Sequence, residues 1–273
     1  MRKATLGYVV EGRQQEGIEK MSAYLSRQLN QSSRVPTRKL GQLAAAAECV
    51  QFMEFSSKAD SAPETVEWLL ASGNRLHLVV ETLEPMDKVG RCMGIIDQLR
   101  RHDPEGCAEY FDLVLAISVV MDRPGKFKMH GQMGRDLLPV ESDPSKVYDY
   151  FKALYSGGSA KVDYQKLGVP ELVFVVVPAP PGELEWAREN VEGSLSGWDE
   201  KYSDIEYDHA RLNGSRFSWD HGTYTLRDIE RRGGICVDQA YYAVLTARAH
   251  GIPAIYFHGS GKSANQAWLA LLP

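Results

Sequence analysis

The sequence lacks the features that mark several classes of protein. No apolar run approaches the roughly 20 residues that a transmembrane helix needs, and residues 172–177 form one of the longest. Positive charge is not in excess, because 31 Lys and Arg stand against 36 Asp and Glu, a net charge of −5. Proteins that bind nucleic acid or anionic membranes usually carry a basic face or tail. The sequence therefore predicts a soluble protein with neither nucleic acid nor a membrane as its partner.

The amino terminus lacks the pattern of an export signal. Met1, Arg2 and Lys3 resemble the charged start of a signal peptide, but Glu11 and Arg13 arrive before any continuous apolar segment. We therefore expect no signal peptide, and the compartment stays open.

Cysteine is scarce and shows no metal-binding spacing. None of the four cysteines forms a C-x-x-C pair, so a zinc site or a disulfide framework is not expected, and neither a cofactor nor a metal is predicted. Cys49, Cys92 and Cys107 lie in segments that look helical, where buried cysteines act as small hydrophobic residues. Cys236 differs from them, because two glycines come shortly before it.

The first half of the chain has the hydrophobic spacing of helices. Residues 107–121 are apolar almost all round, which predicts a buried central helix. Asp143 and Pro144 are typical of a helix start, and Gly157 and Gly158 are typical of the end of that helix. The segment offers no constellation of catalytic residue types. Residues 1–158 are therefore predicted to be a helical region of unknown role.

The second half differs from the first in its composition and residue patterns. Residues 172–177 form a β-branched run between prolines, which predicts a buried strand. Pro181 and Gly182 open a predicted helix that continues to Val191. Residues 197–224 are rich in Tyr, Asp, Ser, Gly and His, and their aromatic content favours an ordered irregular loop over disorder.

The last fifty residues follow a definite order of elements. Thr225 and Asp228 have the spacing of a helix start, which predicts a helix over 226–232. Gly233 and Gly234 end that helix. A second helix is expected to begin at Cys236 and to close at residues 251–253. Two apolar strands follow, at residues 254–257 and 266–272, on either side of a glycine-containing loop.

A cysteine in the first turn of a helix has special chemistry. Unpaired backbone N–H groups and the positive end of the helix dipole favour thiolate over thiol. The same N–H groups can stabilise an oxyanion when a carbonyl is attacked. Gly233 and Gly234 allow the tight turn that would let a substrate approach the sulfur. The alternative is that Cys236 is a buried structural cysteine that follows a turn.

The residues around Cys236 resemble a known family. Residues 224–240, residues 251–256 and the pair Ala267-Trp268 are similar to the core of the transglutaminase-like superfamily, which shares its architecture with papain-type cysteine peptidases. The resemblance reaches only the C-terminal part of the chain. It implies an α+β protein, in which a mostly helical region at 1–158 precedes a transglutaminase-like domain at 159–273.

The resemblance also implies a set of site residues. The nucleophile that would form a thioester falls on Cys236, and the general-base histidine of the family falls on Gln266. A neutral amide cannot take a proton from a thiol, so acyl transfer or amide hydrolysis is expected to be impaired. His258 is the candidate replacement base, with a locally bonded strand-end histidine as the alternative. The family's orienting Asp would follow on a later strand, which implies a domain that is incomplete at its C-terminal end.

Two functions follow from these residues. The first is a cysteine-nucleophile enzyme that transfers or hydrolyses amides of a peptide or protein. The second is a catalytically silent relative that binds a peptide or protein in the same cleft, rimmed by Trp198, Trp219 and Trp268. Gln266 favours the silent relative.

Three further patterns have simpler interpretations. Residues 259–263 end in the Gly-Lys-Ser of a phosphate-binding loop, but the first glycine of that motif would fall on Tyr256, so a flexible loop is expected. His209 and His221 each follow an Asp, without the spacing of a metal site. Asp238 is predicted to be a first-turn acid that stabilises the helix dipole.

Overall fold

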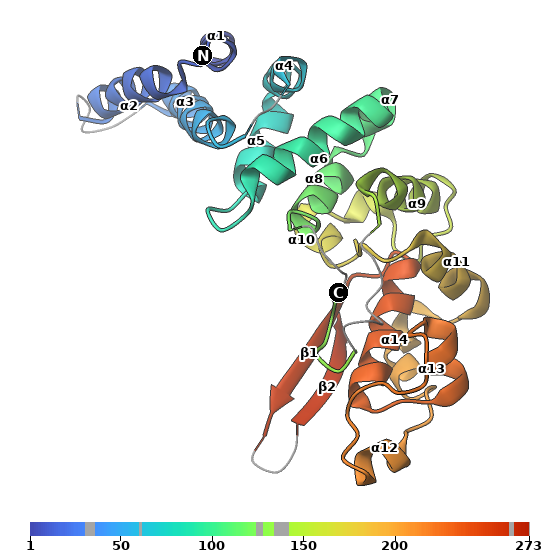
Figure 1. Cartoon of the computed structure of the whole chain (residues 1–273). Coiled ribbons are helices and arrows are strands. Elements are labelled where there is room, and N and C mark those ends of the chain that lie inside the picture. The colour runs from blue at the N-terminus through green and yellow to red at the C-terminus, as the bar shows by residue number, and fades with distance from the viewer. Residues whose placement is uncertain (31–35, 60–61, 124–127, 134–141, 262–264, 273) are drawn as a thin grey trace. The chain divides into compact units, whose positions relative to one another are not determined.

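The computed structural model divides the chain into two compact units, Met1–Arg123 and Pro124–Pro273. It describes residues 1–30, 36–59, 62–123, 128–133, 142–261 and 265–272 (Figure 1). The boundary predicted at 158/159 falls inside the second unit. The reason is the packing of α9 (Pro144–Ser156), where the Tyr150 hydroxyl donates to the carbonyl oxygen of Ala249 across 2.8 Å.

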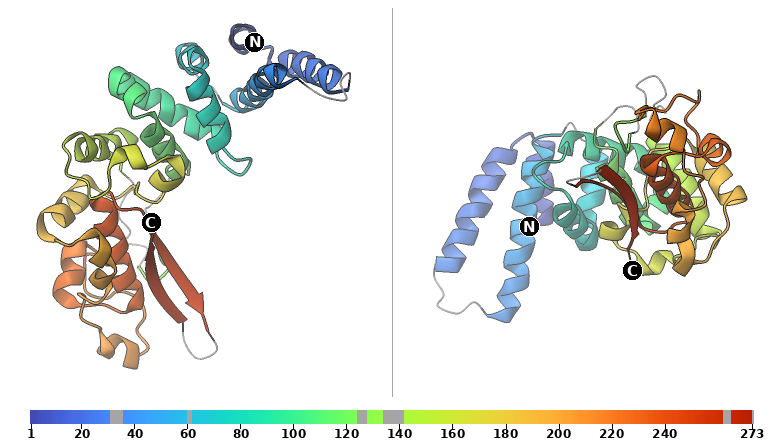
Figure 2. Two further views of the ribbon diagram at one scale, coloured as in Figure 1. Left: turned by 180° about the vertical axis from the view of Figure 1, so that it is seen from behind. Right: turned by 90° about the horizontal axis from the view of Figure 1, so that it is seen from below.

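The described part of the first unit is helical. Helices α2 and α3 lie side by side as a long hairpin (Figure 2), and α8 packs against α5, α6 and α7. The helices are α1 (Arg2–Val10), α2 (Gln14–Asn30), α3 (Thr37–Ser56), α4 (Pro63–Ala71), α5 (Gly73–Thr82), α6 (Val89–His102), α7 (Pro104–Glu109) and α8 (Phe111–Val120).

The predicted central helix of the first unit is divided into two. Most of residues 107–121 are buried as expected, although Ala108 and Glu109 are exposed. Tyr110 has φ −104° and ψ 39°, which ends α7 and begins α8. The Asp103 side chain accepts the Gly106 N–H and so starts α7 separately. Seven of the ten residues of α8 are buried, so this short helix forms the centre of the first unit.

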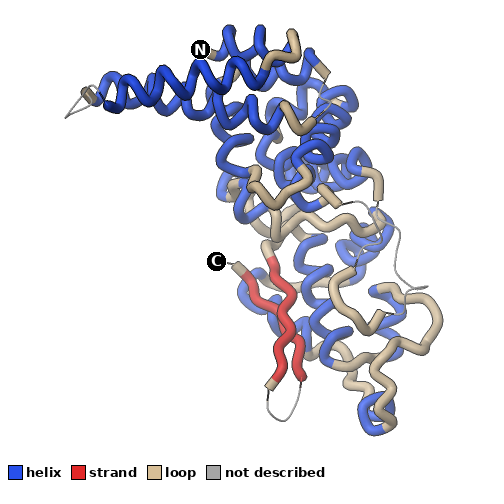
Figure 3. The backbone as a smooth tube through the Cα atoms, turned by 60° about the vertical axis from the view of Figure 1, so that its left-hand side comes forward, coloured by secondary structure: helices blue, strands red, loops and turns tan. Residues whose placement is uncertain are grey.

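The second unit combines helices with a small sheet. The two strands in its described part pair as an antiparallel hairpin (Figure 3). In the register of this hairpin, Tyr256 opposes Leu269 and His258 opposes Ala267. Besides α9, the elements are η2 (Tyr164–Lys166), α10 (Val169–Leu172), α11 (Pro181–Asn190), η3 (Leu195–Tyr202), α12 (His209–Asn213), α13 (Leu226–Arg232), α14 (Cys236–Ala249), β1 (Ala254–Ser260) and β2 (Asn265–Leu271).

Helix α14 is the central element of this unit. It contacts α11, α13, η3 and both strands (Figure 1), and twelve of its fourteen residues are buried. Sequence periodicity predicts one apolar face, whereas small and aromatic residues make the helix buried nearly all round. A helix surrounded in this way has little freedom to shift. Its first residue, Cys236, is thereby held in a fixed place.

The predictions for the last fifty residues are largely confirmed. Helix α13 has the predicted bounds, α14 begins at Cys236, and the two strands follow. The described part of the chain is mostly helical with one small sheet, which agrees with the broad α+β class. Lys262 and Ser263 of the predicted loop, and Pro273, lie outside the described residues. None of the helices in the described ranges has the length and apolar character needed to cross a bilayer.

Two predictions for the middle of the second unit are wrong. The expected strand at 172–177 is instead the end of α10 followed by a turn, because Glu171 accepts the Gly168 N–H and Leu172 accepts the N–H of Val176. The valines there are buried by packing and not by strand pairing. The expected irregular loop at 197–224 contains most of η3 and all of α12.

Candidate functional site

The turn before Cys236 requires both of its glycines. Gly233 has φ +75°, and a Cβ atom there would lie 2.5 Å from the Glu206 carbonyl oxygen. A Cβ atom on Gly234 would lie 2.4 Å from the Cβ of Asp238. Neither distance leaves room for a methyl group, so any larger residue would displace the start of α14.

The turn is also fastened to a segment distant in sequence. The Gly234 N–H donates to the Glu206 carbonyl oxygen, and the Gly234 carbonyl oxygen accepts the Asp208 N–H, both at 2.9 Å. These bonds make a parallel bridge between Tyr207 and Gly234. Segment 206–208 therefore fixes the backbone that presents Cys236.

Cys236 is the accessible cysteine among the described residues. It is half-buried, whereas Cys49, Cys92 and Cys107 are buried, and burial raises the pKa of Cys92 and of Cys107 to about 12. Cys236 and Tyr207 pack against the same buried cluster, which includes Ile235 and Val237. The cysteine thus meets the structural requirements of a reactive thiol, namely exposure and a place in the first turn of a helix.

A cavity of about 510 Å³ opens beside Cys236. It brings together three of the predicted residues, Cys236, Gln266 and His258. The residues that line it are His130, Gly131, Gln132, Tyr207, Leu212, Phe217, Ile235, Cys236, Val237, Tyr256, His258, Gly259, Ser260, Asn265 and Gln266. Most of these side chains are apolar or uncharged, as in many sites that bind small molecules or peptides.

Gln266 is engaged by a tyrosine at the cavity. Its Nε2 donates to the Tyr202 hydroxyl across 2.9 Å, and that hydroxyl donates to the Ala267 carbonyl oxygen, also across 2.9 Å. Burial raises the pKa of Tyr202 to about 12, so the phenol stays protonated at neutral pH. Neither Gln266 nor Tyr202 can accept a proton from the thiol of Cys236 under these conditions.

His258 lies on β1 and its side chain is exposed. Its ring centroid is 6.3 Å from that of Tyr256. It lines the same cavity as Cys236.

A buried hydrogen-bonded chain behind the cavity has no counterpart in the sequence-based predictions. His130 Nδ1 accepts the Gln132 N–H (3.3 Å), which leaves the proton on Nε2 to donate to the Tyr224 hydroxyl (2.7 Å). Tyr224 then donates to Asp238 Oδ1 (2.8 Å). Burial, together with the charge of Arg211, lowers the pKa of His130 to about 3, so this imidazole is neutral.

Asp238 lies in the first turn of α14 as predicted, but that prediction missed its buried ion pair. Its carboxylate does accept the Ile235 N–H at the start of α14 (2.9 Å), but it is fully buried and paired with Arg211 at 2.8 Å. Burial raises the pKa of Asp238, while Arg211, the Ile235 N–H and the Tyr224 hydroxyl oppose that rise. Its main role is to join α14 to segment 209–224, a contact that 27 residues of separation hide from sequence patterns.

The aromatic rim differs from the predicted one. Trp198 and Trp219 are buried, and Trp268 is 44% exposed and stacks on Phe257. None of the three is among the residues that line the cavity; Tyr207, Phe217 and Tyr256 are. Trp219 instead supports the wall, because its backbone N–H donates to the Gln132 carbonyl oxygen across 3.1 Å.

The two histidines of segment 197–224 contact neighbours within that segment. His221 Nε2 lies 3.3 Å from Asp208 Oδ2, and His209 packs on Tyr207 with ring centroids 5.1 Å apart. Within the described ranges, no group of three or more His, Cys, Asp or Glu is arranged to hold a metal ion.

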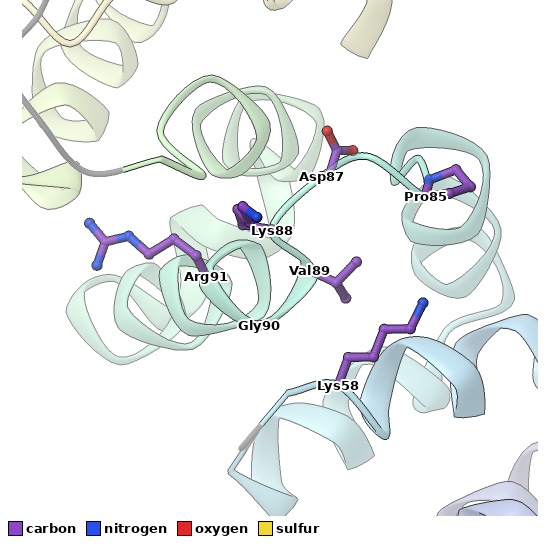
Figure 4. A pocket seen from close by; sticks show the side chains of 7 residues that line it. All are labelled: Lys58, Pro85, Asp87, Lys88, Val89, Gly90 and Arg91. Carbon is purple, nitrogen blue, oxygen red and sulfur yellow. The ribbon is translucent and has the colours of Figure 1, made fainter.

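The first unit has a cavity of its own, of about 350 Å³ (Figure 4). It is lined by Lys58, Pro85, Asp87, Lys88, Val89, Gly90 and Arg91. The Lys58 and Arg91 side chains extend in different directions (Figure 4), so their charges do not converge on one ligand atom. We assign no chemistry to this cavity.

Comparison of the chain with protein-family models, with curated proteins and with solved structures finds no match.

Proposed function

We propose that the second unit is a transglutaminase-like domain whose cavity binds a peptide segment beside Cys236 without efficient acyl transfer. The order of elements supports this assignment: α13, a Gly-Gly turn, α14 with Cys236 in its first turn, then β1 and β2. This is the order that the family resemblance implies. The ligand would be a segment of a peptide or protein, because the cavity is mostly apolar and lies beside a potential acyl acceptor.

The observation that carries the proposal is the pairing of Cys236 and Gln266 in one cavity. Acyl transfer through a thioester needs a group that removes the thiol proton and later protonates the leaving amine. Gln266 stands where the resemblance places that group, and its amide donates to Tyr202 instead. A neutral amide can orient a ligand carbonyl or N–H but cannot carry a proton. The site is therefore suited to binding.

The exposed imidazole of His258 favours a second candidate function. If His258 serves as the base, Cys236 would attack an amide carbonyl, and His258 would deliver the proton to the departing amine. Water or a second amine would then cleave the thioester and regenerate the thiol. This candidate predicts turnover that needs both Cys236 and His258.

One set of measurements on the full chain separates the two candidates. The probe is the blocked tripeptide N-acetyl-Ala-Leu-Ala-amide. We expect it to slow iodoacetamide labelling of Cys236, followed by mass spectrometry, and to release no amine beyond that seen with Cys236→Ser. The buried Cys49, Cys92 and Cys107 serve as internal controls that should stay unlabelled.

Two results would decide against the binding function. Turnover that disappears in both Cys236→Ser and His258→Asn would establish the enzyme instead. Labelling of Cys236 that no peptide slows, at any concentration up to the solubility limit, would show that the cavity does not bind peptides.

A further inference from the structure

Two polar atoms in the wall of the Cys236 cavity have no hydrogen-bond partner among the described residues. They are Gln132 Oε1 and the hydroxyl oxygen of Tyr256, and both atoms are buried. Gln132 and Tyr256 both line the cavity. An unsatisfied buried polar atom costs about 1–3 kcal/mol, so such atoms in a native protein usually have a purpose. Here both are found in one cavity.

Gln132 and Tyr256 are each held by contacts with neighbouring segments. The Gln132 backbone donates to His130 Nδ1 and accepts from the Trp219 N–H. Tyr256 opposes Leu269 in the hairpin, and its ring stacks on His130 with centroids 6.0 Å apart. The residues that carry the two polar atoms are therefore held by contacts of their backbone or ring, and such preorganisation lowers the entropic cost of binding a ligand.

The rest of the wall is suited to an uncharged ligand. Among the described residues that line the cavity, none is Asp, Glu, Lys or Arg. His130 is neutral at physiological pH, because burial lowers its pKa to about 3. Leu212, Phe217, Ile235 and Val237 supply apolar surface, and Phe217 is 46% exposed. A charged ligand group would lose its hydration here without gaining an ion-pair partner.

We propose that Gln132 Oε1 accepts a backbone N–H of the bound peptide and that the Tyr256 hydroxyl donates to one of its carbonyl oxygens. A peptide backbone carries the matching donor and acceptor in every residue. An uncharged apolar side chain of the peptide packs against Leu212 and Phe217. The assignment rests on the proposed peptide-binding function and names the chemistry by which the cavity recognises its ligand.

The Tyr256→Phe substitution tests the donor. It removes only the hydroxyl, which has no hydrogen-bond partner in the described part of the chain, so the free energy of unfolding should stay the same or increase. Affinity for N-acetyl-Ala-Leu-Ala-amide should fall about fivefold, since one neutral hydrogen bond is lost. Tyr155→Phe is the matched control, because the Tyr155 hydroxyl is equally buried and unpartnered but lies outside the cavity lining. That variant should bind the tripeptide as the wild type does.

A backbone-modified peptide tests the acceptor. Three tripeptides in which one amide N–H at a time is replaced by an ester oxygen lose one donor each. One of them should bind the wild type about fivefold more weakly than the parent tripeptide. In Gln132→Met the difference should vanish, because the acceptor is absent. A Leu-centred tripeptide should also bind at least tenfold more tightly than its Asp- or Lys-centred counterpart.

The outcomes separate this assignment from the function on which it rests. Wild-type affinity in Tyr256→Phe, or an ester effect that persists in Gln132→Met, would overturn the assignment while leaving peptide binding intact. The absence of any tripeptide binding by the wild type would overturn both.

Discussion

Arg211 and Asp238, the second residue after Cys236, form a fully buried ion pair. Arg211 Nη1 lies 2.8 Å from Asp238 Oδ2, and the two side chains are 1% and 0% exposed. Arg211 Nη2 also donates to the Phe217 carbonyl oxygen across 2.8 Å. One guanidinium therefore joins the start of α14 to the segment that supplies Leu212 and Phe217 to the cavity wall.

Removal of Arg211 should be strongly destabilising. Arg211→Met leaves the Asp238 carboxylate buried without its counter-ion, so the free energy of unfolding of the second unit should fall by about 3–5 kcal/mol. Arg216→Met is the control, because Arg216 pairs with Asp220 at 3.0 Å in an exposed position, where such pairs contribute about 0–1 kcal/mol. Urea denaturation measures both. Equal losses in the two variants would contradict the role assigned to Arg211.

His130 should make the stability of the second unit pH-dependent. Its pKa is lowered to about 3 in the folded state from the ordinary value of 6.5, so the folded state binds fewer protons than the unfolded one at acidic pH. The stability from keeping His130 neutral is full above pH 6.5 and is lost as pH falls from 6.5 toward 3, by about 1.4 kcal/mol per pH unit. His130→Gln keeps a donor and an acceptor but does not titrate.

The measurement is the free energy of unfolding at pH 7 and at pH 5. Between these values the wild type should lose about 2 kcal/mol more than His130→Gln. Parallel losses in the two proteins would show that His130 titrates normally in the folded state.

The Gly-Gly turn should tolerate no side chain. Gly233→Ala places a Cβ at a positive φ and against the Glu206 carbonyl oxygen, so it should destabilise the second unit by more than about 1–3 kcal/mol, the typical cost of such a backbone conformation alone. Gly182→Ala, in the first turn of α11 with open space around it, should be neutral or slightly stabilising. Thermal unfolding of the two variants provides the comparison, and a neutral Gly233→Ala would show that the turn can relax.

An imidazole at position 266 should raise the reactivity of Cys236. Gln266→His supplies the base that the family resemblance places there, and general-base assistance is typically worth about 10²–10⁴-fold in rate. Even a tenfold faster reaction with iodoacetamide at pH 7 would support the proposed geometry. Gln266→Asn, which removes the bond to Tyr202 without adding a base, is the control. No change in Gln266→His would argue that position 266 does not face the thiol.

Local sequence patterns predicted the elements that carry the site. Thr225 and Asp228 mark the start of α13, and the Thr225 side chain does accept the Asp228 N–H. Gly233 and Gly234 mark the turn, because their lack of a side chain is a local requirement. Cys236 begins α14 because the Gly-Gly turn breaks the preceding helix and a continuous helical pattern follows.

The same patterns failed where burial and not pairing decides the structure. The valines at 175–177 suggested a strand, since β-branched residues are common in both strands and buried turns. Pro170 and Glu171 instead favour a helix start, which only the contacts of Glu171 with Gly168 reveal.

What the sequence by itself determined is the order of local elements and the identity of the residues with chemistry to offer, Cys236, His258 and Gln266. The elements and Cys236 depend on neighbours a few residues apart, through capping, periodicity and the conformational freedom of glycine. Gln266, and His258 as its replacement base, are instead what the family resemblance implies. The tertiary structure alone decided that His130, Gln132 and Arg211 join the site or its support, at separations of 27 to more than 100 residues. Such contacts arise from the packing of α14 against its surroundings, and no local pattern encodes which distant loop will fill that space.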